Sequence, residues 1–295
     1  MIASAWGRWT RSWFPPVPLE RLALFRLAAT SVVLVDVVVH AGSVGRSLTI
    51  DRAFLDPVAL VRVVELLGLD PIPSRGAHLA GTVLLVVALA AGVLGYRTRW
   101  ALGVAAPLYL YHWALRSSWG TIEHAQTPLV LALIVLAVAP SGMCWSLDAL
   151  QRARRRRANP RTEPRVTGRE LDPLAGWALR IVAVGVVLTY LLTLVAALRG
   201  TEAAWPGPIQ TFVWFAYASA PLALTGGTRR NVVLGMLGAL HLVDHTLFAT
   251  PFAGFAVGYL AFFELERWIP QRQGLRMAPL RADRSHTHHH RQHAR

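Results

Sequence analysis

Residues 174–198 read LAGWALRIVAVGVVLTYLLTLVAAL, an apolar run that contains a single charged side chain, Arg180. A hydrocarbon core about 30 Å thick is crossed by about 20 helical residues, and lipid offers no partner to unpaired backbone groups. This stretch is therefore predicted to be a membrane-spanning helix, and it sets the fold class of the whole chain.

Similar apolar runs recur on both sides of this stretch. Together they predict an all-α fold, a polytopic transmembrane helical bundle. The eight predicted spans are residues 22–41, 78–95, 100–115, 128–145, 174–198, 210–225, 231–248 and 252–268.

The composition supports a membrane protein. Of 295 residues, 54% are apolar and 16% are charged, too few charges to cover a soluble protein of this length. All thirty basic residues are arginine, so chemistry that needs a lysine amine or a Schiff base is excluded. Because Cys144 is the one cysteine, an intramolecular disulfide and a cysteine-based zinc site are excluded too.

The arginines predict how the chain is oriented. They collect before the first span and in every second connection, and short cytoplasmic loops are enriched in arginine. Both termini are therefore predicted to be cytoplasmic, in a multi-pass protein of the plasma membrane. The basic segments are residues 8–21, 97–99, 152–169 and 229–230 and the tail after residue 268.

The segments outside the spans divide the chain into three parts. Residues 1–17 are predicted to form an interfacial amphipathic helix, because Trp6, Trp9 and Trp13 share one helical face before Pro15 and Pro16. Residues 18–270 form the transmembrane domain, with a basic cytoplasmic loop at 150–172 and a short helix at 57–69 on the outer interface. Residues 271–295 are a basic, histidine-rich tail that is predicted to be disordered and able to bind metal adventitiously.

The basic loop suggests its partner. The stretch from Arg152 to Arg169 is predicted to be disordered and bound to anionic lipid headgroups. Nucleic acid is not expected, because no aromatic residues are interleaved with the arginines. Membrane lipids are thus the expected partners, and the sequence indicates no protein partner.

Ionisable residues inside spans are costly, so each one is a candidate functional residue. Arg26, Arg180 and Glu264 lie near the cytoplasmic ends of their spans and are interpreted as interfacial anchors or members of helix-end ion pairs. A second set lies in the outer half of the membrane and predicts one outward-facing polar cavity. Its members are Asp36, His40, His112, Arg116, Glu123, His124, His241, Asp244 and His245.

The stripe of His241, Asp244 and His245 has helical spacing, so that His241 and His245 could share one metal ion. A third ligand from another helix is not indicated by the sequence. Histidine and aspartate side chains that satisfy one another between helices are the commoner case, and proton carriage is a further alternative.

Three segments resemble a known family. Span one contains an internal Arg and Asp, SWGTIEH (residues 118–124) leads into an apolar span, and PSGMCWSLDA (residues 140–149) closes it. In this order they resemble the HTTM family, the membrane domain shared with vitamin-K-dependent gamma-carboxylases, over roughly residues 21–268. The resemblance implies a site facing the outer side, a quinone-type cofactor and a catalytic role for His124.

The chain departs from the family's carboxylases in span five. Their Tyr-x-x-x-Gly-x-Lys-Lys-Leu pattern corresponds to residues 190–198, where Ala196 and Ala197 replace the lysines, one of which is thought to activate the quinol. True carboxylase activity is therefore not expected. The leading hypothesis is binding of a quinone or lipid-like molecule in the outward cavity; the alternatives are a metal or small-solute transporter and a non-catalytic membrane scaffold or immunity-type protein.

Overall fold

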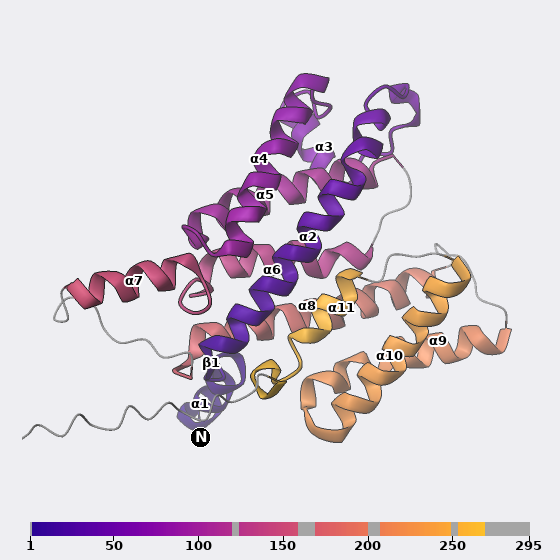
Figure 1. Ribbon diagram of the computed structural model, residues 1–295. Coiled ribbons are helices and arrows are strands. Elements are labelled where there is room, and N and C mark those ends of the chain that lie inside the picture. Colours follow the sequence, from indigo (N-terminus) through magenta and orange to yellow (C-terminus); the bar gives the residue numbers. More distant parts are fainter. Residues whose placement is uncertain (1, 120–123, 159–168, 200–206, 249–252, 269–295) are drawn as a thin grey trace, which may run out of the picture.

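The computed structural model describes residues 2–119, 124–158, 169–199, 207–248 and 253–268. This part of the chain is helical apart from two short strands, which confirms the all-α fold class (Figure 1). Three of its helices, α2, α4 and α8, are long and apolar enough to cross a membrane. The helices are α1 (Ile2–Trp13), α2 (Leu19–Ser47), α3 (Ala59–Leu66), α4 (Arg75–Leu94), α5 (Thr98–Ser117), α6 (Thr127–Val138), α7 (Leu147–Ala158), α8 (Pro173–Leu198), α9 (Gly207–Ser219), α10 (Gly227–Phe248) and α11 (Ala253–Leu260). The 3-10 turns are η1 (Arg52–Phe54), η2 (His124–Gln126), η3 (Ala220–Thr225) and η4 (Leu265–Trp268), and the strands are β1 (Val17–Pro18) and β2 (Leu171–Asp172).

Each predicted span coincides with a helix, but three of these helices end earlier than expected. In the span predicted at 210–225, α9 ends at Ser219 and residues 220–225 form the 3-10 turn η3. The helix α6 ends at Val138, seven residues before the predicted end at 145, because Pro140 disfavours a helical conformation in the residue before it. The helix α11 ends at Leu260, and the chain continues in tight turns in which Ala261, Phe262 and Phe263 each donate to the third residue before them. The count of eight spans stays a prediction.

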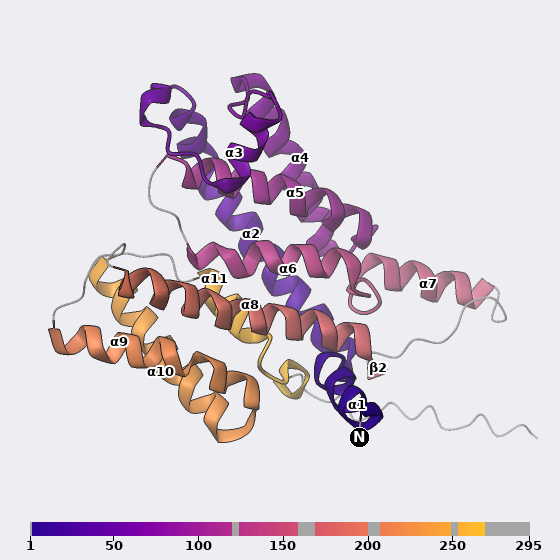
Figure 2. The ribbon, with the colours of Figure 1, turned by 180° about the vertical axis from the view of Figure 1, so that it is seen from behind.

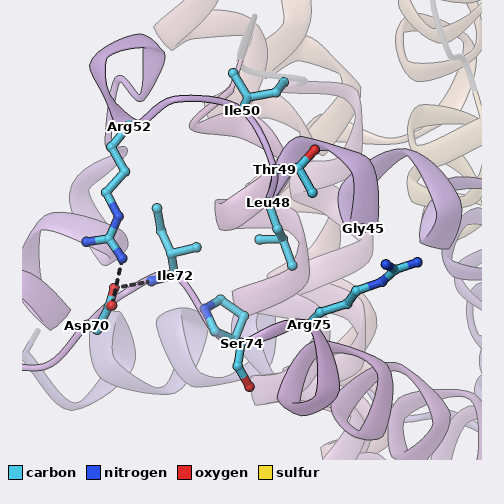
Figure 3. Close-up of a pocket in the computed structure, with 10 residues that line it drawn as sticks. Gly45, Leu48, Thr49, Ile50, Arg52, Asp70, Ile72, Ser74 and Arg75 are labelled. Atoms are coloured by element: carbon cyan, nitrogen blue, oxygen red, sulfur yellow. Dashed lines mark hydrogen bonds and ion pairs between the residues drawn. The ribbon is translucent and has the colours of Figure 1, made fainter.

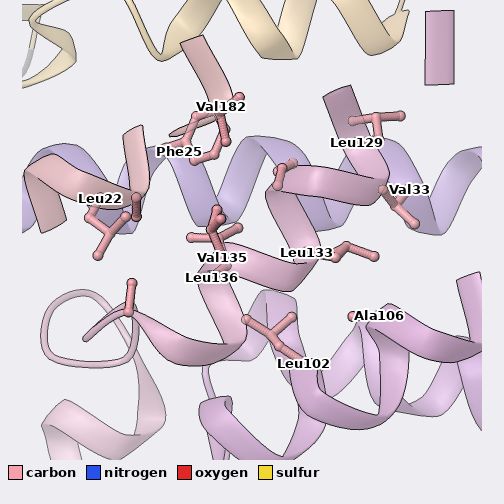
Figure 4. Close-up of a cluster of buried hydrophobic side chains, with 14 of the residues drawn as sticks. Leu22, Phe25, Val33, Leu102, Ala106, Leu129, Leu133, Val135, Leu136 and Val182 are labelled. Carbon is pink, nitrogen blue, oxygen red and sulfur yellow. The ribbon is translucent and has the colours of Figure 1, made fainter. Parts of the chain in front are cut away.

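The main core lies where α2 crosses the helices α4, α5, α6 and α8. Leu22, Phe25 and Val33 of α2 are fully buried there against Leu133 and Leu136 of α6 (Figure 4). A second, smaller core joins α8 to α9, α10 and α11. The outer faces of α4 and α8 remain apolar and exposed, as expected of surfaces that lipid covers.

A short antiparallel strand pair ties the beginnings of α2 and α8 together. Val17 pairs with Asp172 and Pro18 with Leu171, and the Leu19 amide donates to the Glu170 carbonyl at 3.1 Å. This clasp was not predicted, because two-residue strands carry no periodic pattern. It holds the N-terminal ends of two long helices at the same end of the bundle.

The first part of the basic loop is ordered, contrary to the prediction of disorder. Residues 150–158 of this loop belong to α7, which begins at Leu147 and runs away from the bundle in both views (Figures 1 and 2). The sequence LDALQRARRRRA is made mostly of strong helix formers, and the Ser146 hydroxyl oxygen caps the helix by accepting from the Ala149 amide at 2.9 Å. The helix expected at 57–69 is present over Ala59–Leu66 as α3.

Arg26 is not an interfacial anchor. Its side chain is fully buried and donates to the carbonyls of Ser141 at 2.9 Å and Trp145 at 2.7 Å. The interpretation from depth alone was wrong because residues 139–146 fold back over this end of α2, where they offer backbone carbonyls in place of water. Of the other two residues given that role, Arg180 donates to the Leu224 carbonyl at 3.1 Å, and Glu264 pairs with Arg267.

Candidate functional site

Asp36 lies at the centre of the polar groups in the first half of the chain. Its side chain is almost completely buried in α2, and one carboxylate oxygen, Oδ2, accepts from the Tyr109 hydroxyl at 3.0 Å. The other oxygen, Oδ1, is 3.1 Å from His40 Nδ1, 3.2 Å from Arg116 Nη1 and 3.4 Å from Gln126 Nε2. Three donors therefore meet on one carboxylate, and His40 Nδ1 lies beside it while donating to the Asp36 backbone carbonyl at 2.9 Å.

Helical spacing explains how these donors reach the same point. His40 follows Asp36 by one turn of α2, and Tyr109 and Arg116 are two turns apart on α5, so each pair shares a face. Gln126 arrives from η2, which leads into α6. A buried carboxylate is stable only when donors compensate it, so Asp36 holds α2, α5 and η2 in a fixed arrangement.

A groove of about 370 Å³ runs along the side of α2 next to this carboxylate. Most of its wall is apolar, and its polar lining residues are Ser31, Asp36, His40 and Gln126. The residues that line it are Ser31, Val32, Val35, Asp36, Val39, His40, Gln126 and Ala253. A pocket of this size and character suits a largely apolar ligand with a polar head.

Two further histidines, His112 of α5 and His78 of α4, lie near the Asp36 cluster. The His112 side chain is 5% exposed, and its ring stacks on that of His78 with 6.3 Å between centroids and 12° between planes. The His112 Nε2 atom is buried and has no hydrogen-bond partner in the part of the chain that is described. His78 was not among the predicted cavity residues.

His241 belongs to a different cluster, in the second core. Its Nε2 atom is 2.6 Å from the Tyr190 hydroxyl, and Tyr190 is also hydrogen-bonded to Tyr259. Phe255 stacks on the imidazole with 4.3 Å between ring centroids. The neighbouring stripe residues differ in exposure, since Asp244 is half-buried and His245 is exposed.

The structure therefore divides the predicted cavity in two. Asp36, His40, His112 and Arg116 gather between α2 and α5, whereas His241, Asp244 and His245 lie on α10 beside α8 and α11. Linear sequence spacing placed all of them at one depth, but helix rotation and packing put them in separate cores.

The remaining predicted site residues are less informative. Among the described residues, no group of three His, Cys, Asp or Glu side chains is close enough to hold a metal ion, so the pair His241 and His245 gains no third ligand there. His124 lies in η2 with an exposed side chain and does not line the groove. Glu123 and the histidine-rich tail lie outside the described residues.

Tyr109, Gln126 and Tyr190 were missed by the sequence reasoning, which searched only for charged and imidazole side chains. A signal for Tyr109 was present, because Tyr109, His112 and Arg116 follow helical spacing on one face of α5. No such signal marks Gln126 or Tyr190.

Comparison of the chain with protein-family models, with curated proteins and with solved structures finds no match. The function is therefore argued from the geometry of the Asp36 cluster and its groove.

Proposed function

We propose that this protein is a multi-pass plasma-membrane protein that binds a quinone-type or lipid-like molecule in the groove beside Asp36. The single observation that carries the proposal is the groove itself, which is lined by Val32, Val35 and Val39 and also by Asp36, His40 and Gln126. An apolar ring or chain fits the valine wall, and the Gln126 amide and the His40 imidazole can donate to a carbonyl oxygen.

The proposed topology has eight spans with both termini in the cytoplasm. It is supported by the arginines, since the α4–α5 turn, α7 and the turn before α10 carry basic residues at one end of the bundle (Figure 1). In this orientation Asp36 and His40 lie toward the outer side. Anionic headgroups of the inner leaflet are the proposed partners of the stretch from Arg152 to Arg169, because α7 exposes Arg154, Arg155 and Arg157.

Membership of the HTTM family is part of the proposal, on the motifs quoted from the sequence. His124 is then the candidate catalytic residue, two positions before Gln126 of the groove wall. Ala196 and Ala197 at the lysine positions argue against gamma-carboxylation, so the proposed activity is binding of the molecule, with proton exchange by neighbouring side chains.

The experiment fills the groove with a larger side chain. Val35 lines the groove and is 61% exposed, whereas Val38 on the same helix is 57% exposed and lies outside the groove. Purified protein in detergent is titrated with menadione, a small naphthoquinone, and isothermal titration calorimetry measures binding. We expect Val35→Trp to weaken binding by about tenfold or more, which corresponds to about 1.4 kcal/mol, and Val38→Trp to leave it unchanged.

Mass spectrometry of lipid extracts from the purified wild-type protein identifies the natural ligand. Binding that is equal in Val35→Trp and wild type, together with extracts free of any quinone or isoprenoid, would refute the proposal and favour the scaffold alternative.

A further inference from the structure

A second cavity opens on the outer side of the molecule, between the end of α2 and the beginning of α4 (Figure 3). Its volume is about 390 Å³, and its wall is polar. Arg52 and Asp70 form an ion pair of 2.7 Å on one side, and Thr49, Ser74 and Arg75 contribute polar groups elsewhere. Water and buffer therefore have access to this cavity.

His78 lies directly behind the cavity wall. It follows Ser74 by one turn of α4, and its amide donates to the Ser74 carbonyl at 2.9 Å. Its imidazole lies against Gly45, which lines the cavity: a Cβ atom on Gly45 would be 3.9 Å from His78 Cδ2. The imidazole therefore lies within van der Waals reach of a residue that lines the cavity.

His112 lies beside His78 on the side away from the cavity, further into the protein. Its ring is parallel to that of His78, and its Nε2 atom is buried without a partner among the described residues. A buried polar atom left unsatisfied costs about 1–3 kcal/mol, so a packed helix would retain such a group only for a reason. Proton transfer would explain it. An imidazole that accepts and releases a proton needs one ring nitrogen without a fixed partner, because fixed partners on both nitrogens would hold it in one protonation state.

Asp36 and His40 are the last residues in this series, and both line the groove. The titratable and charged groups that act on His112 are Asp36 and His40 of α2, His78 of α4 and Arg116 of α5. His112 precedes Arg116 by one turn on the same face of α5, and Arg116 is paired with Asp36. The carboxylate in turn contacts His40, which lines the groove.

We propose that His78 and His112 form the path by which protons pass between the outer aqueous cavity and the Asp36–His40 pair at the groove. The use of this path by a bound ligand rests on the proposed function, but proton passage itself does not. A ligand hydroxyl that loses a proton to the Asp36–His40 pair at the groove then has a route for that proton to the outer cavity.

The test needs no ligand. Protein in detergent is shifted rapidly from about pH 7 to about pH 5, and time-resolved infrared bands report when a proton reaches the Asp36–His40 pair. Asp36→Asn and His40→Gln assign the bands. We expect His112→Phe and His78→Phe each to slow the response by about a hundredfold, the low end of what a positioned proton carrier contributes, with the same final amplitude.

His245→Phe, an exposed histidine on α10, is the matched control and keeps the wild-type rate. If His112→Phe does not fold, His78→Phe carries the test, because His78 is only partly buried. Wild-type rates in both variants would overturn the path, whatever the menadione titration shows. If both variants respond slowly and the wild-type protein does not bind menadione, the proton path through His78 and His112 stands and the proposed binding of a quinone-type molecule is wrong.

Discussion

Arg26 shows how a charged residue is accommodated at the end of a spanning helix. Its guanidinium is fully enclosed, with backbone carbonyls of Ser141 and Trp145 as acceptors. Gly95 makes this possible, because it has a φ of +66° and a Cβ atom there would lie 2.8 Å from Arg26 Nη1. The hydrogen bonds of Arg26 thus join α2 to the segment after α6, and the turn between α4 and α5 packs against the same guanidinium at Gly95.

Replacement of Arg26 by Gln is expected to destabilise the protein strongly. The shorter amide cannot reach both carbonyls, and each acceptor that loses its donor costs about 1–3 kcal/mol. Thermal unfolding in detergent, followed by tryptophan fluorescence, measures the effect. Arg99→Gln is the control, since Arg99 is exposed at the beginning of α5; equal melting temperatures for the two variants would contradict a role for the buried contacts.

At the scale of elements, the PSGMCWSLDA segment is a connector between helices. The Asp148 carboxylate accepts from the Arg97 amide at 2.8 Å, the Thr98 amide at 2.8 Å and the Thr98 hydroxyl at 2.7 Å. The Asp148 amide donates to the Gly95 carbonyl at 3.0 Å. The aspartate of this segment thus caps the beginning of α5 and joins it to α7, which gives a structural reason for that residue type.

This cap predicts a dependence of stability on pH. Burial alone raises the pKa of Asp148, but the hydrogen bonds from Thr98 and Arg97 outweigh it and hold the pKa of this carboxyl below its ordinary value. A depressed folded-state pKa contributes stability above the unfolded value of about 3.9, and this contribution is lost as the pH falls through the folded value.

The measurement compares melting temperatures of wild type and Asp148→Asn between about pH 7 and pH 3. We expect a constant difference above about pH 5 that narrows below about pH 4. Thr98→Val, which removes one of the three donors, should give a smaller difference of the same form. A difference independent of pH down to the lowest value would show that the charge of Asp148 contributes nothing.

At the scale of the whole molecule, the proposed orientation can be tested with cysteine labelling. The native Cys144 is buried and is first replaced by Ala. Single cysteines are then introduced at other positions of this cysteine-free protein. Leu66 of α3 is 85% exposed and lies on the proposed outer side, and Arg154 of α7 is exposed on the proposed inner side.

A membrane-impermeant maleimide applied to intact cells should label Leu66→Cys and should label Arg154→Cys only after permeabilisation. The physical reason is that arginine-rich loops stay on the cytoplasmic side. The opposite pattern would place the groove of Asp36 toward the cytoplasm and would remove the basis for the outward-facing site.

Much of the fold was predictable because each helix carries its own signal. Apolar runs of spanning length predicted a helix at each of the eight positions, and Pro15 and Pro16 follow the end of the N-terminal helix. The clasp between β1 and β2 was not predictable in this way, since it depends on contact between two segments that are distant in the sequence.

The sequence by itself determined that this chain is helical and apolar, and it identified Asp36, His40 and Arg116 as costly residues that need partners. Those properties follow from composition and local periodicity, which each segment carries on its own. Only the tertiary structure decided that Asp36 collects Tyr109, Arg116 and Gln126, and that His241 belongs to another core. Helix rotation and crossing are set by side-chain packing over the whole bundle, and this packing is not encoded at any single position.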